Sequence, residues 1–219
     1  MTNKFHDALM RGPIICFTLF FVVRGFDGLR TLIGSHPSLD GDIAFLVNLA
    51  ARISVIEFLL LLVVFHLVRH RPLKKFDAWT PKVTAMLGLT LSLAVLLLPR
   101  AAEDPWFDGA SAALVLAGNT MCILTLMTLG RSISIMPEAR ELVVEGMYRR
   151  IRHPLYLAEE IALVGVFLQF RSWPAAAVLV VHLLFQLGRI HWEEKILVEA
   201  FPQYQEYRRG TWRLIPGIY

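Results

Sequence analysis

Long apolar runs are the feature that most limits what this chain can fold into. Four such runs precede residue 130, at approximately residues 13–33, 43–68, 83–98 and 110–129. A helix needs roughly 20 apolar residues to cross a bilayer, and a backbone in lipid must satisfy its own hydrogen bonds. The alternation of polar and apolar residues that marks a barrel is absent. We therefore predict an all-α integral membrane protein with four transmembrane helices.

The composition agrees with a membrane protein, since 56% of the residues are hydrophobic and the mean hydropathy is +0.55. Cys16 and Cys122 both lie inside apolar runs, so a disulfide framework or a cysteine-rich metal site is not expected. His153, His182 and His191 lack the i,i+4 spacing of a helical metal-binding pair. The formal charge of +4 is carried largely by loops and does not indicate a nucleic-acid partner.

Two shorter apolar stretches, 155–170 and 174–188, follow and are separated by Arg171, Ser172 and Trp173. This pattern predicts a membrane-embedded helical hairpin, with Trp173 as an interfacial anchor near its tip. Residues 201–219 are then expected to form a cytoplasmic C-terminal segment, whose Tyr204 and Tyr207 supply aromatic surface for a cover at the membrane interface. We interpret 1–130 as a transmembrane scaffold and 131–219 as the catalytic region of a single integrated domain.

Loop charges orient the predicted helices. Acidic residues dominate the third connection, whereas basic residues crowd the second connection and the one that precedes the hairpin; the basic ones are Arg69, Arg71, Lys74, Lys75, Lys82, Arg131, Arg140, Arg149, Arg150 and Arg152. By the positive-inside rule these two connections are cytoplasmic, and so are both termini. In a prokaryote the membrane would be the cytoplasmic (inner) membrane.

Two charged islands, 146–160 and 189–197, interrupt the apolar sequence. Ionisable groups at membrane depth are costly and are usually retained for a function. Pro154 suits the first position of a helix, which places His153 at the start of that helix. Tyr156 and Glu160 are four residues apart and share a helix face, with Glu159 beside them. These islands are the predicted functional site.

The second island continues a polar stripe. His182, Gln186, Arg189 and Glu193 are separated by four, three and four residues, so they follow one face of a helix. Such a stripe must face other helices or a water-filled cavity. An alternative interpretation is a purely structural i,i+4 pair between Arg189 and Glu193.

An ordered set of motifs follows along the chain: Arg-His-Pro-Leu-Tyr at 152–156, Arg189 followed by Glu193-Glu194-Lys-Ile-Leu197, Phe201-Pro-Gln-Tyr204-Gln-Glu-Tyr207, and Leu214-Ile215-Pro216. These motifs resemble the C-terminal catalytic region of the isoprenylcysteine carboxyl methyltransferase family. The preceding segments 129–135 and 146–148 are similar to prokaryotic members, so the resemblance covers about residues 125–219. The glycine that often follows the first motif is Ala158 here.

The resemblance implies a methyltransferase that uses S-adenosylmethionine without a Rossmann domain, and the sequence indeed has no Gly-x-Gly-x-x-Gly motif between a strand and a helix. It implies a lipophilic or lipid-modified acceptor in the membrane, first of all an isoprenylcysteine-like carboxylate, with phospholipid amines and small thiols as alternatives. The expected cofactor-binding residues are His153, Pro154, Tyr156, Glu160, Glu193 and Glu194.

Arg152, Arg189 and Glu193 are the candidates for the chemistry itself, with Glu160 as an alternative base. Arg152 and Arg189 could orient an anionic acceptor, since guanidinium binds carboxylate bidentately. A carboxylate needs no base, whereas an amine does, and Glu193 or Glu160 would then serve.

Two other function classes remain open at this point. A transporter or channel would use the intramembrane charges Arg24, Asp27, Arg52 and Glu57. A sterol-type reductase would bind a nicotinamide cofactor instead of a methyl donor.

Overall fold

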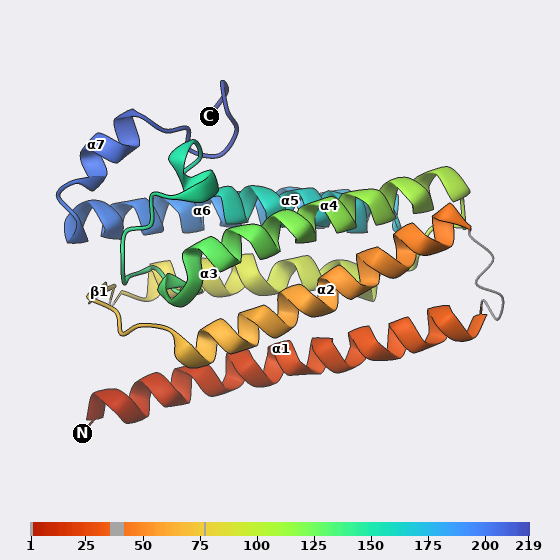
Figure 1. Ribbon diagram of the computed structural model, residues 1–219, viewed down its shortest axis with the longest axis horizontal. Coiled ribbons are helices and arrows are strands. Elements are labelled where there is room, and N and C mark those ends of the chain that lie inside the picture. The colour runs from red at the N-terminus through yellow and green to blue at the C-terminus, as the bar shows by residue number, and fades with distance from the viewer. Residues whose placement is uncertain (1, 36–41, 77) are drawn as a thin grey trace.

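The chain folds into a bundle of helices that run along one long axis (Figure 1). The computed structural model describes residues 2–35, 42–76 and 78–219. Its α-helices are α1 (Thr2–Ser35), α2 (Ile43–Val68), α3 (Trp79–Thr90), α4 (Pro105–Leu129), α5 (Pro154–Phe167), α6 (Trp173–Ala200) and α7 (Tyr204–Arg209). Three 3₁₀ helices accompany them, η1 (Leu91–Leu97), η2 (Gly130–Ser132) and η3 (Gly146–Arg149).

A two-stranded antiparallel sheet pairs β1 (Lys74–Lys75) with β2 (Glu138–Ala139), with Lys74 opposite Ala139 and Lys75 opposite Glu138. It ties the connection after α2 to the connection after α4.

Local sequence sets where several helices begin. The side chains of Asp42, Asp104 and Ser172 accept hydrogen bonds from the first turns of α2, α4 and α6, which satisfies backbone donors that a helix leaves free. Proline stands at the start of α5, where its missing N–H is not needed. Pro154 therefore begins the motif helix, as predicted from the sequence.

Four helical segments are long and apolar enough to cross a membrane: Gly12–Ser35, Ile43–Val68, Pro105–Ser132 and Trp173–Ala200. The predicted number of spans, four, is confirmed, but the predicted span at 83–98 is not among them. The run at 83–98 is divided between the 12-residue α3 and the 3₁₀ helix η1. Its place is taken by the 28-residue α6, which continues past Gly188 because its charged residues find partners inside the protein.

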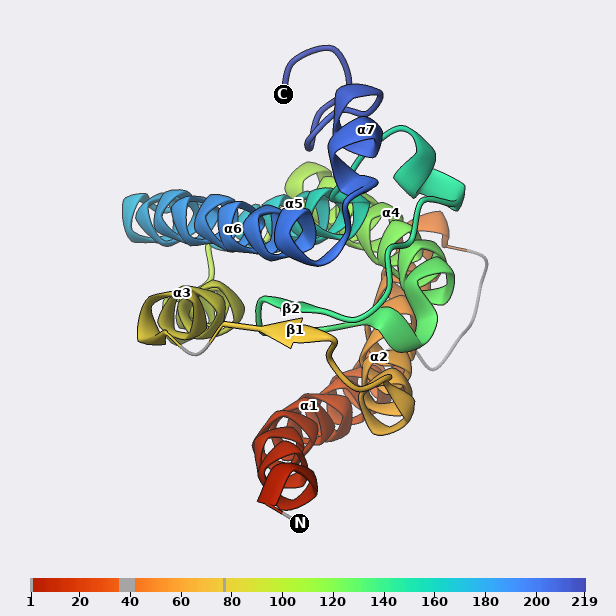
Figure 2. The same cartoon turned by 90° about the vertical axis from the view of Figure 1, so that its left-hand side faces the viewer.

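Viewed along the bundle, the helices form an open ring around the sheet (Figure 2). Around this ring α1 packs on α2, α2 on α4, α4 on α5, α5 on α6, and α6 on α3. α5 and α6 are antiparallel arms joined by residues 168–172, and the backbone N–H of Ala101 donates to the carbonyl of Gln169 in this turn, at 2.9 Å. The membrane placement of this hairpin stays a prediction.

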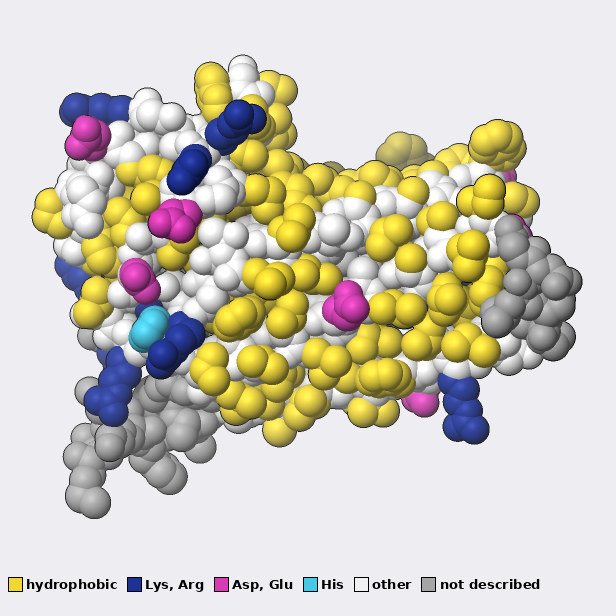
Figure 3. Space-filling view, viewed as in Figure 1, with side chains coloured by type: hydrophobic (Ala, Val, Ile, Leu, Met, Phe, Trp, Pro, Cys, Tyr) yellow, Lys and Arg dark blue, Asp and Glu magenta, His cyan; other side chains and the backbone are white. Residues whose placement is uncertain are grey.

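Hydrophobic side chains cover most of the side of the bundle seen in Figure 3, and charged side chains gather at one end. Phe20, Val23, Leu46, Leu60 and Leu124 are among the exposed apolar residues. A soluble surface rarely exposes so much contiguous apolar area, whereas a bilayer favours it. The chain is a membrane protein on this ground.

Two glycines bring α4 and α5 into close contact. A Cβ atom at Gly118 would lie 2.5 Å from the backbone nitrogen of Ala162 and 2.8 Å from the carbonyl oxygen of Ala158. A Cβ at Gly165 would lie 2.9 Å from the carbonyl oxygen of Ser111. Small residues allow helix backbones in a membrane to approach each other, and here they fix α5, which carries the motif, against α4.

We therefore predict that Gly118→Ala destabilises the protein by about 1–3 kcal/mol, the usual cost of overpacking, because the clash is with backbone atoms that cannot move aside. Gly109→Ala on the same helix is the control, since a Cβ atom added there would have nothing within 4 Å; helix propensity should make it neutral or stabilising by up to ~1 kcal/mol. The measurement is the unfolding midpoint in detergent. Equal midpoints for the two variants would contradict the close packing.

Candidate functional site

The two charged islands meet at the end of the bundle where α5 begins, beside the C-terminal segment. The C-terminal segment is bonded to the residues that precede α5: the N–H of Trp212 donates to the carbonyl of Arg150 (2.9 Å), and the N–H of Arg152 donates to the carbonyl of Trp212 (2.8 Å). The N–H of His153 donates to the carbonyl of Arg213 (3.2 Å). The two segments therefore position the side chains of the first motif together.

Glu194 is the centre of a buried ion cluster. Its Oε1 accepts a hydrogen bond from Arg152 Nε at 2.7 Å and lies 3.3 Å from His153 Nε2. Its Oε2 lies 3.1 Å from Arg213 Nε. The Glu194 side chain is 9% exposed. We call Glu194, Arg152, His153 and Arg213 the Glu194 cluster, and it joins α6, the start of α5 and the C-terminal segment.

Glu193 points to a different neighbour, as its position one residue earlier on α6 requires. Its Oε2 accepts a hydrogen bond from the hydroxyl of Tyr156 at 2.7 Å and lies 4.0 Å from His153 Nδ1. The rings of His153 and Tyr156 stack with their centroids 5.6 Å apart. Because the Glu193 side chain is 35% exposed, it retains acceptor capacity for a ligand.

The polar stripe of α6 faces α5, as the spacing predicted. Nη1 of Arg189 donates to Gln186 Oε1 at 2.7 Å, and Gln186 Nε2 donates to Glu159 Oε2 at 2.8 Å. The Arg189 guanidinium lies over the Tyr156 ring, 4.8 Å from its centroid. The alternative Arg189–Glu193 pair is not formed, since Arg189 donates to Gln186 and Glu193 accepts from Tyr156.

One cavity, the site cavity, is lined by most of these side chains, but not by Glu194, Arg213 or Gln186. Its polar lining includes Tyr148, Arg152, His153, Tyr156, Glu159, Arg189, Glu193, Tyr204 and Tyr207. Its apolar lining comes from other helices, with Leu62 on α2, Leu89 on α3 and Leu129 on α4. Residues 132–136 and several residues of 138–143 complete the wall.

Most of the sequence-predicted residues come together here. Arg152, His153, Tyr156, Arg189 and Glu193 line the site cavity. Glu194 lies behind His153 within its own cluster, and the buried Pro154 lies at the start of α5 outside the cavity lining.

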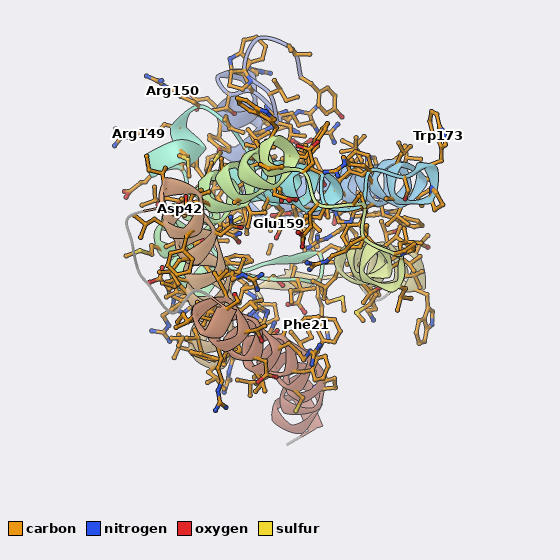
Figure 4. All side chains as sticks on the ribbon, turned by 90° about the vertical axis from the view of Figure 1, so that its right-hand side faces the viewer. Phe21, Asp42, Arg149, Arg150, Glu159 and Trp173 are labelled. Atoms are coloured by element: carbon orange, nitrogen blue, oxygen red, sulfur yellow. The ribbon has the colours of Figure 1, made fainter. Side chains whose placement is uncertain are left out.

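Glu160 departs from the prediction that it shares the site with Tyr156. Its Oε1 lies 3.0 Å from Nε2 of His182, and Glu159 lines the site cavity in its place. Both glutamates flank the face of Tyr156, one about 60° to one side and one about 40° to the other by the ~100° rotation per residue, so spacing alone could not choose between them. In Figure 4, Glu159 points into the interior of the bundle, whereas Arg149, Arg150 and Trp173 lie at its periphery.

Three tyrosines from outside α5 and α6 add donors to the site cavity. Burial raises the pKa of Tyr148 and of Tyr204 well above their ordinary value, and raises the pKa of Tyr207 to about 12. All three are therefore protonated at neutral pH. The Tyr207 hydroxyl donates to the carbonyl of Tyr148 at 2.7 Å. Sequence reasoning assigned Tyr204 and Tyr207 to a cover and gave Tyr148 no role in the site.

Residues 111–199 match the model of the isoprenylcysteine carboxyl methyltransferase (ICMT) family. The match covers about two fifths of the chain, so this segment is similar to that family. The match contains all of α5 and nearly all of α6, and it excludes Tyr204, Tyr207 and Arg213. The family match and the four candidate spans together make the chain similar to membrane methyltransferases.

Two curated relatives carry metal-resistance names. The nickel-cobalt-cadmium resistance protein NccN of Alcaligenes xylosoxydans xylosoxydans is 30% identical over 117 residues, 53% of this chain and 54% of its own length. The cobalt-zinc-cadmium resistance protein CzcN of Cupriavidus metallidurans is 30% identical over 157 residues, 69% of this chain and 66% of its own length. The chain thus spans about half to two thirds of these relatives, and neither name states a methyl acceptor.

The Glu194 cluster predicts a large effect of a small change. Glu194→Gln keeps the shape of the side chain but leaves Arg152 and Arg213 without a counter-charge, which should cost about 3–5 kcal/mol, the range for breaking a buried pair. Glu199→Gln on the same helix is the control, because Glu199 pairs with Lys74 at the exposed surface, where the loss of an ion pair has little effect on stability. Unfolding midpoints in detergent measure both, and similar losses would argue against the central role of Glu194.

Proposed function

We propose that this protein transfers a methyl group from S-adenosylmethionine to a lipophilic acceptor at the site cavity. One observation carries the proposal: the polar residues of the family-matched segment converge on a cavity whose other walls are apolar side chains of α2, α3 and α4. A polar cofactor and a lipophilic acceptor need such a two-sided site. The catalytic region 131–219 would then act together with helices of the scaffold 1–130.

The residues present fit the cofactor. S-adenosylmethionine offers an amino-acid group, ribose hydroxyls and an adenine ring, so it needs both donors and acceptors from the protein. Two buried polar atoms of the cavity-lining residues have no hydrogen-bond partner in the described part of the chain, Arg189 Nε and the Tyr204 hydroxyl. An unsatisfied buried donor is costly, and a bound ligand would satisfy it.

Several side chains would hold the cofactor. The Glu193 carboxylate suits its ammonium or ribose hydroxyls, and His153 lies beside Glu193. The aromatic faces of Tyr148, Tyr204 and Tyr207 suit adenine or a sulfonium cation. When bound, the cofactor supplies an electrophilic methyl group on a positively charged sulfur.

The protein's own contribution is position. Displacement at a methyl group requires the donor and acceptor atoms in line, and holding them so can supply much of the acceleration. The Glu194 cluster fixes His153, and Tyr156 fixes Glu193. Residues 201–219 would cover the cofactor from the cytoplasmic side, while the acceptor would enter between helices from the lipid.

The contacts of the two arginines bear on which chemical group of the acceptor receives the methyl group. A carboxylate bound by Arg152 and Arg189 was the sequence-based expectation, but Arg152 is engaged by Glu194 and two backbone carbonyls. Arg189 is engaged by Gln186 and the Tyr156 ring, which leaves its Nε as a donor without a partner among the described residues.

The first test is cofactor binding. S-adenosylhomocysteine should raise the melting temperature of the detergent-solubilised protein, with a stabilisation of about 2.7 kcal/mol at roughly 100 times its Kd by mass action. Glu193→Gln should weaken this binding by about 1–3 kcal/mol, the range for a charged hydrogen bond, while Glu199→Gln leaves it unchanged. Calorimetric titration that detects no binding to folded wild-type protein would overturn the proposal, and stabilisation by NADPH instead would favour a reductase.

A second test uses the hydroxyl that lacks a partner. Tyr204→Phe removes no hydrogen bond within the described chain, so the protein without ligand should keep its stability, whereas affinity for S-adenosylhomocysteine should fall by about 0.5–1.5 kcal/mol. Tyr207→Phe is the matched control, because it loses the bond to Tyr148 and should lower stability even without ligand. Unchanged affinity in Tyr204→Phe would remove this hydroxyl from the site.

A further inference from the structure

Glu159 is a carboxylate of the site cavity that the roles described above leave unused. It lies about one helical turn beyond Tyr156 on α5, farther from the end of the bundle that holds the Glu194 cluster. Leu62 of α2 and Leu89, the next-to-last residue of α3, line the same cavity, and so do Glu138, Arg140 and Glu141. Glu159 thus lies farther along α5 than Tyr156, in a cavity whose lining is partly apolar.

The only hydrogen-bond donor that Glu159 has within the described residues is the neutral amide of Gln186, at 2.8 Å from its Oε2. The neighbouring acidic residues are paired differently, since Glu160 faces His182 and Glu194 faces Arg152 and Arg213. The second oxygen of Glu159 therefore remains available to a ligand in the cavity.

Arg189 does not neutralise Glu159 directly. Gln186 lies between them, with its oxygen toward Arg189 and its nitrogen toward Glu159. The guanidinium also lies on the face of Tyr156. This arrangement holds the cation on the α6 side and leaves the carboxylate facing the cavity without a cation in contact.

A carboxylate in a partly apolar cavity is costly unless a cation or a hydrogen-bond donor meets it. A carboxylate acceptor would bring a second anion to the same place, which like-charge repulsion disfavours. A thiol acceptor is uncharged and would gain little from an interaction with the Glu159 carboxylate. A protonated amine supplies both the counter-charge and the donors.

We propose that the methyl acceptor is a lipophilic amine and that Glu159 binds its ammonium group. The inference rests on the proposed function, because it takes the site cavity as the place where acceptor and methyl donor meet. It changes the expected substrate class from carboxylate to amine.

The chemistry balances with groups already named. The ammonium gives one proton to the Glu159 carboxylate and becomes a neutral amine. The amine nitrogen then forms a bond to the methyl carbon with its lone pair, while the carbon–sulfur bond breaks and leaves its electron pair on sulfur. The products are a methylated ammonium and a neutral thioether, and the Glu159 carboxyl returns its proton to water.

Three probes with one chain length test the inference: octylamine, octanoate and octanethiol. Their binding to wild-type protein, Glu159→Gln and Glu160→Gln is measured in detergent without cofactor, from the shift in melting temperature and by calorimetry. Octylamine should bind wild-type protein more tightly than octanoate or octanethiol. Glu159→Gln should weaken octylamine binding at least tenfold, as the loss of a charged hydrogen bond of about 1.5–3 kcal/mol implies. Glu160→Gln, the same change one residue along, should retain it.

Tighter binding of octanoate or octanethiol than of octylamine by wild-type protein would overturn the inference, and so would unchanged octylamine affinity in Glu159→Gln. If Glu159→Gln does not fold, the order of the three probes on wild-type protein decides alone. S-adenosylhomocysteine binding, measured on the same samples, separates the two proposals. If the protein prefers octylamine but does not bind S-adenosylhomocysteine, the proposed methyl donor is refuted. If it binds S-adenosylhomocysteine but does not prefer octylamine, only the amine acceptor is refuted.

Discussion

The buried carboxylate of Glu194 is the interaction on which the rest of the site depends. It meets Arg152 and His153 from the start of α5 and Arg213 from the C-terminal segment, so three parts of the chain that are distant in sequence share one counter-ion. Two of its partners carry a permanent positive charge, and such groups are stable in a buried position only while paired. The C-terminal segment is therefore held to the bundle by charge as well as by backbone hydrogen bonds.

That arrangement gives the two adjacent glutamates different tasks. Because successive residues on a helix are rotated by ~100°, Glu194 turns toward the ion cluster while Glu193 turns toward Tyr156 and the cavity. The pair forms one motif in the sequence, yet one side chain is engaged by cations and the other remains partly exposed. In the proposed enzyme, Glu194 positions the site and Glu193 contacts the ligand.

Much of the fold could be predicted from the sequence, because lipid imposes helices on apolar runs and Pro154 marks where a helix can begin. The run at 83–98 is helical as predicted, but it is not one continuous α-helix, since hydropathy cannot tell an α-helix that continues from one that tightens into a 3₁₀ helix at Leu91. The polar stripe placed Arg189 and Glu193 on the same helix as the apolar stretch 174–188, and α6 continues through both. The partners of these charged residues, such as Gln186 for Arg189, depend on packing, which the sequence does not give.

The dependence on packing also limits how much of the site could be predicted from the sequence. The motifs indicated which segments meet, and five of the expected side chains line one cavity. The choice between Glu159 and Glu160 depends on how α5 is rotated against α4 and α6, and the close contacts at Gly118 and Gly165 set that rotation. No spacing rule within α5 contains this information, because one side of each close contact lies on the facing helix α4.

Gln186 lies between the opposite charges of Arg189 and Glu159 and leaves both able to bind a ligand. If Arg189 and Glu159 were in direct contact, each would satisfy the other and neither would have reason to bind a ligand. An amide between them bonds to both, with its oxygen toward the cation and its nitrogen toward the anion, so each charge is partly stabilised and keeps some hydrogen-bonding capacity. Arg189 retains Nε, and Glu159 retains its second oxygen. Gln186 thus separates the positive charge of Arg189, which lies over Tyr156, from the negative charge of Glu159. A cavity lined by both charges can hold two ligands of different polarity at adjacent positions.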